Sequence, residues 1–192
     1  MSRADLGSRA RMIEATIGLM RGSGLAGAGI NDIVRESGAP KGSVYHFFPN
    51  GKVQIVSEAL EIYSQQVFTF VDQALASKRA PADKIRALFD AFARRVTEGD
   101  FQKSCALGTV SLDLNNALEE LRVILNTAFS EFRSLIAEHF DFADRRRAQS
   151  FAGLVLTTIE GAYIRCRAER SSRPFKEAGV WLAELAERRS SA

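Results

Sequence analysis

A short run of residues near the start of the chain carries hydrogen-bond donors and one cation. The run consists of Lys41, Gly42, Ser43, Tyr45 and His46. No carboxylate occurs between Ser37 and Glu58, so no negative charge in this stretch repels an anion. Phosphate oxygens accept hydrogen bonds from ammonium groups, hydroxyl groups and backbone amides. These residue types therefore predict a surface that binds phosphate groups.

Two short helices are expected to position these side chains. Ile30, Ile33 and Val34 have the i, i+3, i+4 spacing of one apolar helix face. Gly38 follows at the usual place of a left-handed helix cap. Pro40 suits the first position of a second helix, because its missing N–H would have no partner there. The apolar face of that second helix consists of Val44, Phe47 and Phe48.

Two short helices joined by a glycine-containing turn predict a helix-turn-helix. The alternative is an ordinary helical hairpin with a solvated polar face. The combination of Gly38, a very short second helix, Tyr45 beside His46, Pro49 and Lys52 favours DNA binding.

The same stretch resembles the signature of the tetracycline-repressor (TetR) family of transcriptional regulators. The resemblance rests on Ile30, Ile33, Val34, Gly38, Ala39, Pro40, Lys41, Gly42, Ser43, Val44, Tyr45, His46, Phe48, Pro49 and Lys52. The chain departs from the family where Gly29 replaces a usual threonine, where Pro40 replaces a common serine or threonine, and where Asn50-Gly51 adds a residue. The resemblance implies an operator-facing surface with these residues: Asn31, Lys41, Gly42, Ser43, Tyr45, His46 and Lys52.

Positive charge is concentrated in the first part of the chain. Residues 1–52 hold seven Lys or Arg and four Asp or Glu, whereas residues 53–192 hold 19 of each, so the net charge of +3 belongs to the first part. A basic head on a neutral body is typical of nucleic-acid-binding proteins. Arg9 and Arg11, near the start of the first helix, form either a solvated helix end or contacts to a flanking phosphate.

The rest of the chain is expected to be helical, because apolar residues recur with helical spacing and no stretch alternates as a strand would. A long helix is expected from about residue 52 to 77, followed by helices near 84–98, 103–113, 117–140 and 144–168 and after Pro174. The fold class is therefore all-α, with about nine helices. A three-helix helix-turn-helix head at residues 1–52 would be joined by the long helix to a ligand-binding and dimerisation bundle at residues 53–192.

Other classes of site are not indicated by the sequence. Cys105 and Cys166 lack the spacing of a zinc site and suggest the reduced thiols of a cytosolic protein. His46 and His139 are the only histidines, and no catalytic motif surrounds them, so we expect no enzyme activity, cofactor or metal. Met1–Gly7 has no apolar run, and no apolar stretch approaches the ~20 residues that span a bilayer. The prediction is a cytoplasmic protein with no membrane partner.

The resemblance also implies a cavity for a small effector among the helices of the body, mostly apolar with a few polar groups. The segment from Cys105 to Thr109 is similar to that of repressors that sense aromatic or lipophilic compounds. The candidate ligand-binding residues are Phe70, Phe89, Phe92, Cys105, Leu107, Phe129 and Thr158. Core packing is the alternative for each of them.

The last two long helices are expected to form a homodimer interface as a two-fold four-helix bundle. The interface candidates are Phe151, Leu154, Val155, Thr158, Ile159, Ala162, Trp181, Leu182 and Leu185. The alternative is that these residues pack only inside one subunit. A two-fold dimer would require a near-palindromic operator. The expected function is thus a ligand-responsive repressor released from DNA by its effector, and the alternative is a small-molecule-binding adaptor without DNA binding.

Overall fold

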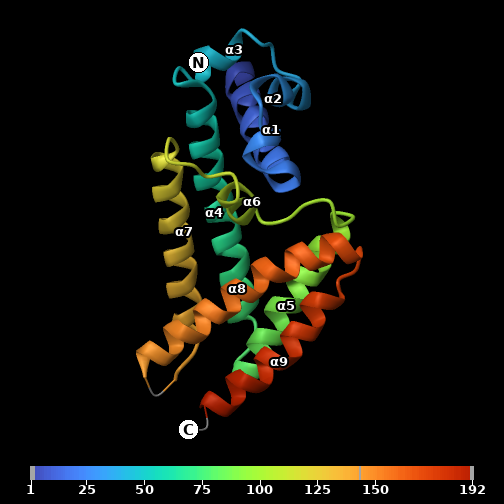
Figure 1. The fold of residues 1–192 in the computed structure, drawn as a ribbon, viewed down its shortest axis with the longest axis vertical. Coiled ribbons are helices and arrows are strands. Elements are labelled where there is room, and N and C mark those ends of the chain that lie inside the picture. Colours follow the sequence, from blue (N-terminus) through green and yellow to red (C-terminus); the bar gives the residue numbers. More distant parts are fainter. Residues whose placement is uncertain (1–2, 143, 191–192) are drawn as a thin grey trace. The chain divides into compact units, whose positions relative to one another are not determined.

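The computed structural model describes residues 3–142 and 144–190, which form nine helices and contain no strand (Figure 1). The helices are α1 (Arg3–Gly27), α2 (Ile30–Ser37), α3 (Ser43–Phe47), α4 (Gly51–Ala76), α5 (Pro81–Glu98), α6 (Ala106–Ser111), α7 (Glu119–Glu138), α8 (Arg145–Glu169) and α9 (Arg173–Ser190). The all-α fold class is confirmed. Within the described residues, no helix combines the length and apolar character needed to cross a bilayer.

The chain divides into two compact units, each assembled from two stretches of sequence. The N-terminal unit consists of Met1–Gln65 and Cys105–Ala128, and the C-terminal unit consists of Gln66–Ser104 and Phe129–Ala192. The N-terminal unit therefore contains all of residues 1–52, where the sequence places the helix-turn-helix head. It also contains α6, which lies much later in the chain.

Helix α1 is the central helix of the N-terminal unit. It begins at Arg3 and ends at Gly27. Its buried residues recur with helical spacing, as expected, and Thr16 completes this face by donating its hydroxyl to the Met12 carbonyl over 2.8 Å. The regular helix is broken at Gly24, whose φ of 66° and ψ of −162° are not helical.

An aromatic cluster forms the centre of the C-terminal unit, where α5 and α9 lie side by side (Figure 1). The ring of Phe175 stacks on Phe92 at 5.6 Å and meets Tyr163 edge-on at 5.2 Å. Phe89 also packs edge-on against Phe175, with 6.1 Å between ring centroids. Buried Gly179 allows this approach of α9 to α5, because a Cβ there would lie 2.8 Å from the Phe89 Cβ.

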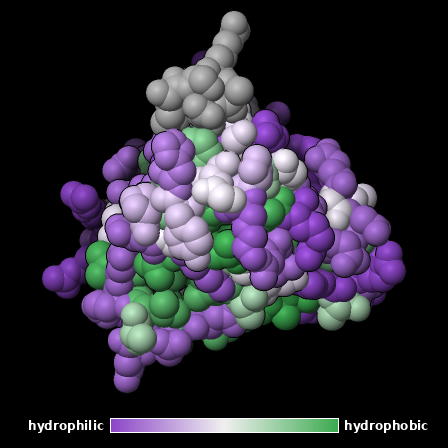
Figure 2. All heavy atoms as spheres, turned by 90° about the horizontal axis from the view of Figure 1, so that it is seen from above, coloured by the Kyte–Doolittle hydropathy of each residue, from purple (hydrophilic) through white to green (hydrophobic). Residues whose placement is uncertain are grey.

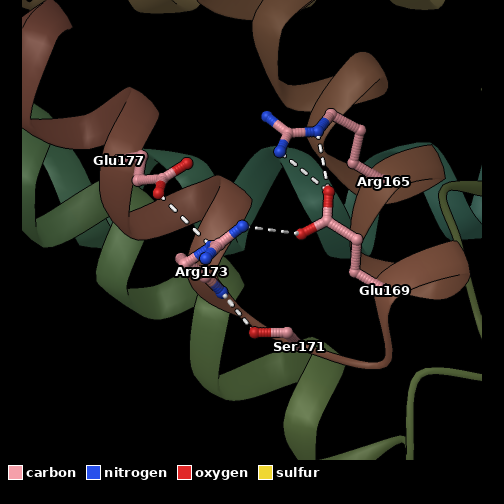
Figure 3. Close-up of polar contacts among 5 residues, drawn as sticks. All are labelled: Arg165, Glu169, Ser171, Arg173 and Glu177. Carbon is pink, nitrogen blue, oxygen red and sulfur yellow. Dashed lines mark hydrogen bonds and ion pairs between the residues drawn. The ribbon is translucent and has the colours of Figure 1, made fainter.

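The turn between α8 and α9 is fixed by polar contacts (Figure 3). Glu169 accepts a hydrogen bond from Arg165 Nε at 2.9 Å and forms an ion pair with Arg173 at 3.7 Å, and Arg173 also pairs with Glu177. The backbone N–H of Arg173 donates to Ser171 Oγ at 3.1 Å. These exposed pairs fix the direction of the turn more than they add stability, since each contributes roughly 0–1 kcal/mol.

Hydrophilic side chains dominate the face drawn in Figure 2, with hydrophobic atoms visible between them. Both cysteines are buried and neither forms a disulfide, in agreement with the reduced thiols that the sequence suggested. Burial raises the pKa of the Cys166 thiol, so this group stays protonated near neutral pH.

The close approach at Gly179 generates a stability prediction. Gly179→Ala should lower the free energy of unfolding by about 1–2 kcal/mol, because overpacking against Phe89 outweighs the gain in helix propensity. Gly18→Ala is the matched control, since a Cβ at Gly18 in α1 meets no atom within 4 Å. This control should raise stability by roughly 0.5–1 kcal/mol. Urea unfolding followed by circular dichroism measures both values, and equal effects would contradict the packing argument.

Candidate nucleic-acid interface

The turn between α2 and α3 is built as the sequence predicts, with one difference. Gly38 is left-handed, with φ of 61° and ψ of 18°, and ends α2. Pro40, however, does not begin α3. Its carbonyl accepts a hydrogen bond from Ser43 N at 2.9 Å, so Pro40 starts a tight turn that precedes the helix. The Lys41 carbonyl accepts from Val44 N at 3.3 Å in the same turn.

Helix α3 has one buried and one exposed face. Val44 and Phe48 are fully buried and Phe47 is nearly so, which confirms the predicted apolar face. On the opposite side the polar residues reach solvent: Lys41, Gly42, Tyr45 and His46 are exposed, and Ser43 is half-buried. Tyr45 is 61 % exposed, which is high for a large aromatic side chain. The structure thus gathers five of the seven predicted DNA-binding residues on one short segment.

The remaining two predicted residues lie on neighbouring helices. Asn31 is exposed in the first turn of α2, whose N-cap, Gly29, makes no side-chain capping bond. Lys52 is half-buried in the first turn of α4, and its ammonium donates to the Leu25 carbonyl at 2.7 Å. The Lys52 side chain therefore has an intramolecular partner at the end of α1.

Two arginines in the first half of α1 contact residues at the ends of α2 and α3. Arg9 forms an ion pair with Glu58 of α4, and its guanidinium lies over the Phe48 ring, 4.9 Å from the centroid. Arg11 donates from Nε to the Ser37 carbonyl, at the end of α2, over 3.1 Å. Sequence reasoning considered a solvated end or a phosphate contact and missed these intramolecular partners. The available signal was Glu58, the first carboxylate after the stretch without acids.

The candidate ligand-binding residues are divided between the two units. Cys105 and Leu107 are buried in the N-terminal unit, at the start of α6. The others belong to the C-terminal unit: Phe70, Phe89, Phe92, Phe129 and Thr158. There, the structure brings Phe70 and Phe92 into edge contact at 5.1 Å, and Arg95 lies over the Phe70 ring.

The candidate interface residues on α8 and α9 differ in exposure. Facing the interior of the C-terminal unit are Phe151, Val155, Ile159, Ala162 and Leu182, all buried. The remaining candidates reach the surface: Leu154 and Trp181 are exposed, and Thr158 and Leu185 are half-buried. Leu154 and Leu185 line the same surface hollow of about 230 Å³, which places them side by side on the outer face of α8 and α9.

Comparison with known sequences finds relatives along most of the chain. Residues 12–59 match the family described as "Bacterial regulatory proteins, tetR family", and residues 81–180 match "Transcriptional regulator LmrA/YxaF-like, C-terminal domain". An uncharacterized HTH-type transcriptional regulator of Mycobacterium tuberculosis is 30 % identical, with 95 % of this chain and 98 % of that protein covered. The HTH-type transcriptional regulator LmrA of Bacillus subtilis is 26 % identical, with 98 % and 100 % covered.

Solved structures share the fold. The regulatory protein TetR from Rhodobacter sphaeroides superposes with a TM-score of 0.81 at 19 % identity, over 95 % of this chain and 98 % of that one. A cysteine mutant of the TetR family transcriptional regulator CifR, complexed with 26-bp double-strand operator DNA, gives a TM-score of 0.77 at 18 % identity, over 93 % and 94 %. At these identities the likeness concerns the arrangement of the helices.

Proposed function

Because this chain belongs to the TetR family of bacterial transcriptional regulators, we propose that it is a cytoplasmic repressor that binds a near-palindromic operator as a homodimer and leaves it when a small lipophilic or aromatic effector binds. The observation that carries the DNA-binding part is the exposed polar segment from Lys41 to His46. Its side chains point away from a buried apolar face, and no acid interrupts them. A phosphate backbone can approach this surface without meeting a like charge.

Selection of DNA by the purified protein tests this proposal. The full-length chain would be used to enrich duplexes from a random pool, and the affinity for the enriched duplex measured at several salt concentrations. We expect near-palindromic duplexes and a steep fall of log affinity with log salt. Failure to enrich any sequence, or a flat salt response, would favour the adaptor without DNA binding. Release of the selected duplex by lipophilic aromatic compounds then tests the effector.

An effector that contacts Phe70 and Phe92 in the C-terminal unit, or Cys105 and Leu107 in the N-terminal unit, would meet mainly apolar surface. The edge contact of Phe70 with Phe92 and the half-exposure of Phe70 support an aromatic compound, since ring-edge and ring-face contacts suit such ligands. The effector can shift DNA binding only if it binds the DNA-free conformation more tightly than the DNA-bound one.

Tyr45 provides the first prediction for DNA contacts. Its exposed hydroxyl can donate to a phosphate oxygen, so Tyr45→Phe should weaken duplex binding by about 1 kcal/mol, a typical hydrogen-bond contribution. Folding should be unaffected, because the ring lies mostly in solvent. Fluorescence-anisotropy titration at fixed salt measures the affinity, and thermal unfolding is the control. Unchanged affinity would remove Tyr45 from the proposed contacts.

The two lysines of the proposed DNA surface differ in a measurable way. Lys41→Ala and Lys52→Ala should each reduce the slope of log affinity against log salt by about one unit if each ammonium meets a phosphate. Lys52→Ala should also lower thermal stability, because the Leu25 carbonyl loses one of its two hydrogen-bond donors, whereas Lys41→Ala should not. A Lys52→Ala variant with weaker binding but an unchanged slope would show that this lysine acts only through α1.

The homodimer proposal is supported by apolar side chains on the outer faces of α8 and α9. Ile164 is 63 % exposed and Val180 is 53 % exposed, in addition to Leu154 and Trp181. Exposed Gly161 lies on the same α8 face as Leu154, seven residues away, and would allow a partner helix to approach closely. Apolar surface of this kind on a soluble protein commonly marks an interface.

Leu154→Arg should therefore convert the dimer to monomer without unfolding it, because this side chain reaches the surface of its own subunit. Leu182→Arg is the contrasting variant: Leu182 is buried inside the C-terminal unit, so an unpaired charge there should unfold that unit. Sedimentation velocity at micromolar concentration gives the assembly state, and circular dichroism gives the folding. A monomeric unmodified chain would refute the interface and the palindromic operator together.

A further inference from the structure

The broken C-terminal end of α1 is held by residues from outside that helix. Gly24 has a left-handed φ, so the regular i→i+4 hydrogen-bond pattern cannot continue through it. Backbone groups around such a break lose their regular partners within the helix and can bind side chains from other segments instead. At this end of α1 the partners come from α4, from α6 and from the residues directly after α6.

Three side chains supply these partners, and we name them the α1 brace: Lys52, Thr109 and Asp113. The Thr109 hydroxyl has one proton to donate, and its nearest acceptor is the Met20 carbonyl at 2.7 Å. The carbonyls of Cys105 and Ala106, one turn earlier in the chain, are farther away, each at 3.1 Å. Asp113 Oδ2 accepts from the Ala26 backbone N–H at 3.1 Å. Lys52 donates to the carbonyl of Leu25, the residue between Gly24 and Ala26, at 2.7 Å.

The residue at the break also fits this arrangement. A Cβ at Gly24 would lie 2.5 Å from Asp113 Oδ2 and 3.3 Å from the Thr109 carbonyl. Glycine is therefore required at this position twice, once for the positive φ and once for the space that Asp113 occupies. Gly38 has a similar φ of 61°, but no atom lies within 4 Å of its hypothetical Cβ. Among the described glycines with positive φ, a contact this close therefore occurs at Gly24 and not at Gly38 or Gly51.

The other end of α1 carries the contacts that hold the helix-turn-helix. Arg9 lies over Phe48, directly after α3, and Arg11 binds the last residue of α2. Met20, which accepts the hydrogen bond from Thr109, lies before the break at Gly24, on the same continuous part of α1 as Arg9 and Arg11, so a displacement of Met20 can reach the helix-turn-helix. The brace residue Asp113 is 87 residues from its partner Ala26 in sequence, yet both belong to the N-terminal unit.

We propose that Thr109 and Asp113 are positioning residues for DNA binding: they fix the end of α1 and, through α1, the orientation of the exposed segment from Lys41 to His46. This inference rests on the proposed DNA-binding function.

The test compares variants of the full-length chain on the duplex that the unmodified protein selects. Thr109→Val and Asp113→Ala should each weaken binding roughly fivefold, the equivalent of one hydrogen bond. Thr109→Ser and Asp113→Asn keep the hydroxyl donor and an acceptor oxygen, so they should restore most of the affinity. Ser111→Ala is the matched control, because the Ser111 hydroxyl donates within α6, to the Leu107 carbonyl at 2.7 Å. This variant should bind DNA as the unmodified chain does.

Hydrogen–deuterium exchange separates the brace from the function it serves. Asp113→Ala should accelerate exchange in the segment that contains Ala26, since this amide loses its acceptor. Asp113 is exposed, so the variant should remain folded. Unchanged exchange would overturn the brace, and faster exchange with unchanged DNA affinity would overturn its positioning role. If the unmodified chain selects no duplex, the proposed function fails, while the exchange result still decides whether the brace exists.

Discussion

The burial of Phe48 behind α3 is the interaction on which the candidate DNA surface depends. A helix of five residues has no stability of its own, because nucleation costs more than so few hydrogen bonds return. Packing of Val44, Phe47 and Phe48 against the N-terminal unit holds it, and Arg9 covers the Phe48 ring. With that side buried, the polar side chains of the segment can only face outward. The exposed surface is thus a consequence of the apolar one.

Glycine at two left-handed positions solves two different problems in the N-terminal unit. Gly38 reverses the chain between α2 and α3 in open space, so only its backbone conformation matters. Gly24 interrupts α1 where Asp113 and Thr109 contact the backbone, so the absence of a side chain matters as well. Gly38 ends α2 through its local backbone geometry, whereas Gly24 leaves space for Thr109 and Asp113 to contact α1. Through such contacts α6, which lies much later in the chain, packs within the N-terminal unit.

The apolar residues of α8 fall into two groups: some are buried inside the C-terminal unit, and others are exposed on its surface. Phe151, Val155 and Ile159 face the interior of the C-terminal unit. Leu154, Gly161 and Ile164 of the same helix are exposed. The helix therefore has an inner apolar face and an outer face of small and apolar residues. The sequence pattern assigned the buried and the exposed residues of α8 to one dimer interface, because spacing alone does not show which apolar residues face the interior of their own subunit.

The sequence by itself determined the all-α class, the helix-turn-helix, the left-handed cap at Gly38 and the buried face of α3, because spacing and backbone preference are local properties. It assigned Pro40 to a helix rather than to a turn. Only the tertiary structure decided the partners of Arg9 and Lys52 and the contact of Asp113 with α1. A long charged side chain can reach many groups, and a contact between residues 87 positions apart exists only after the chain has folded.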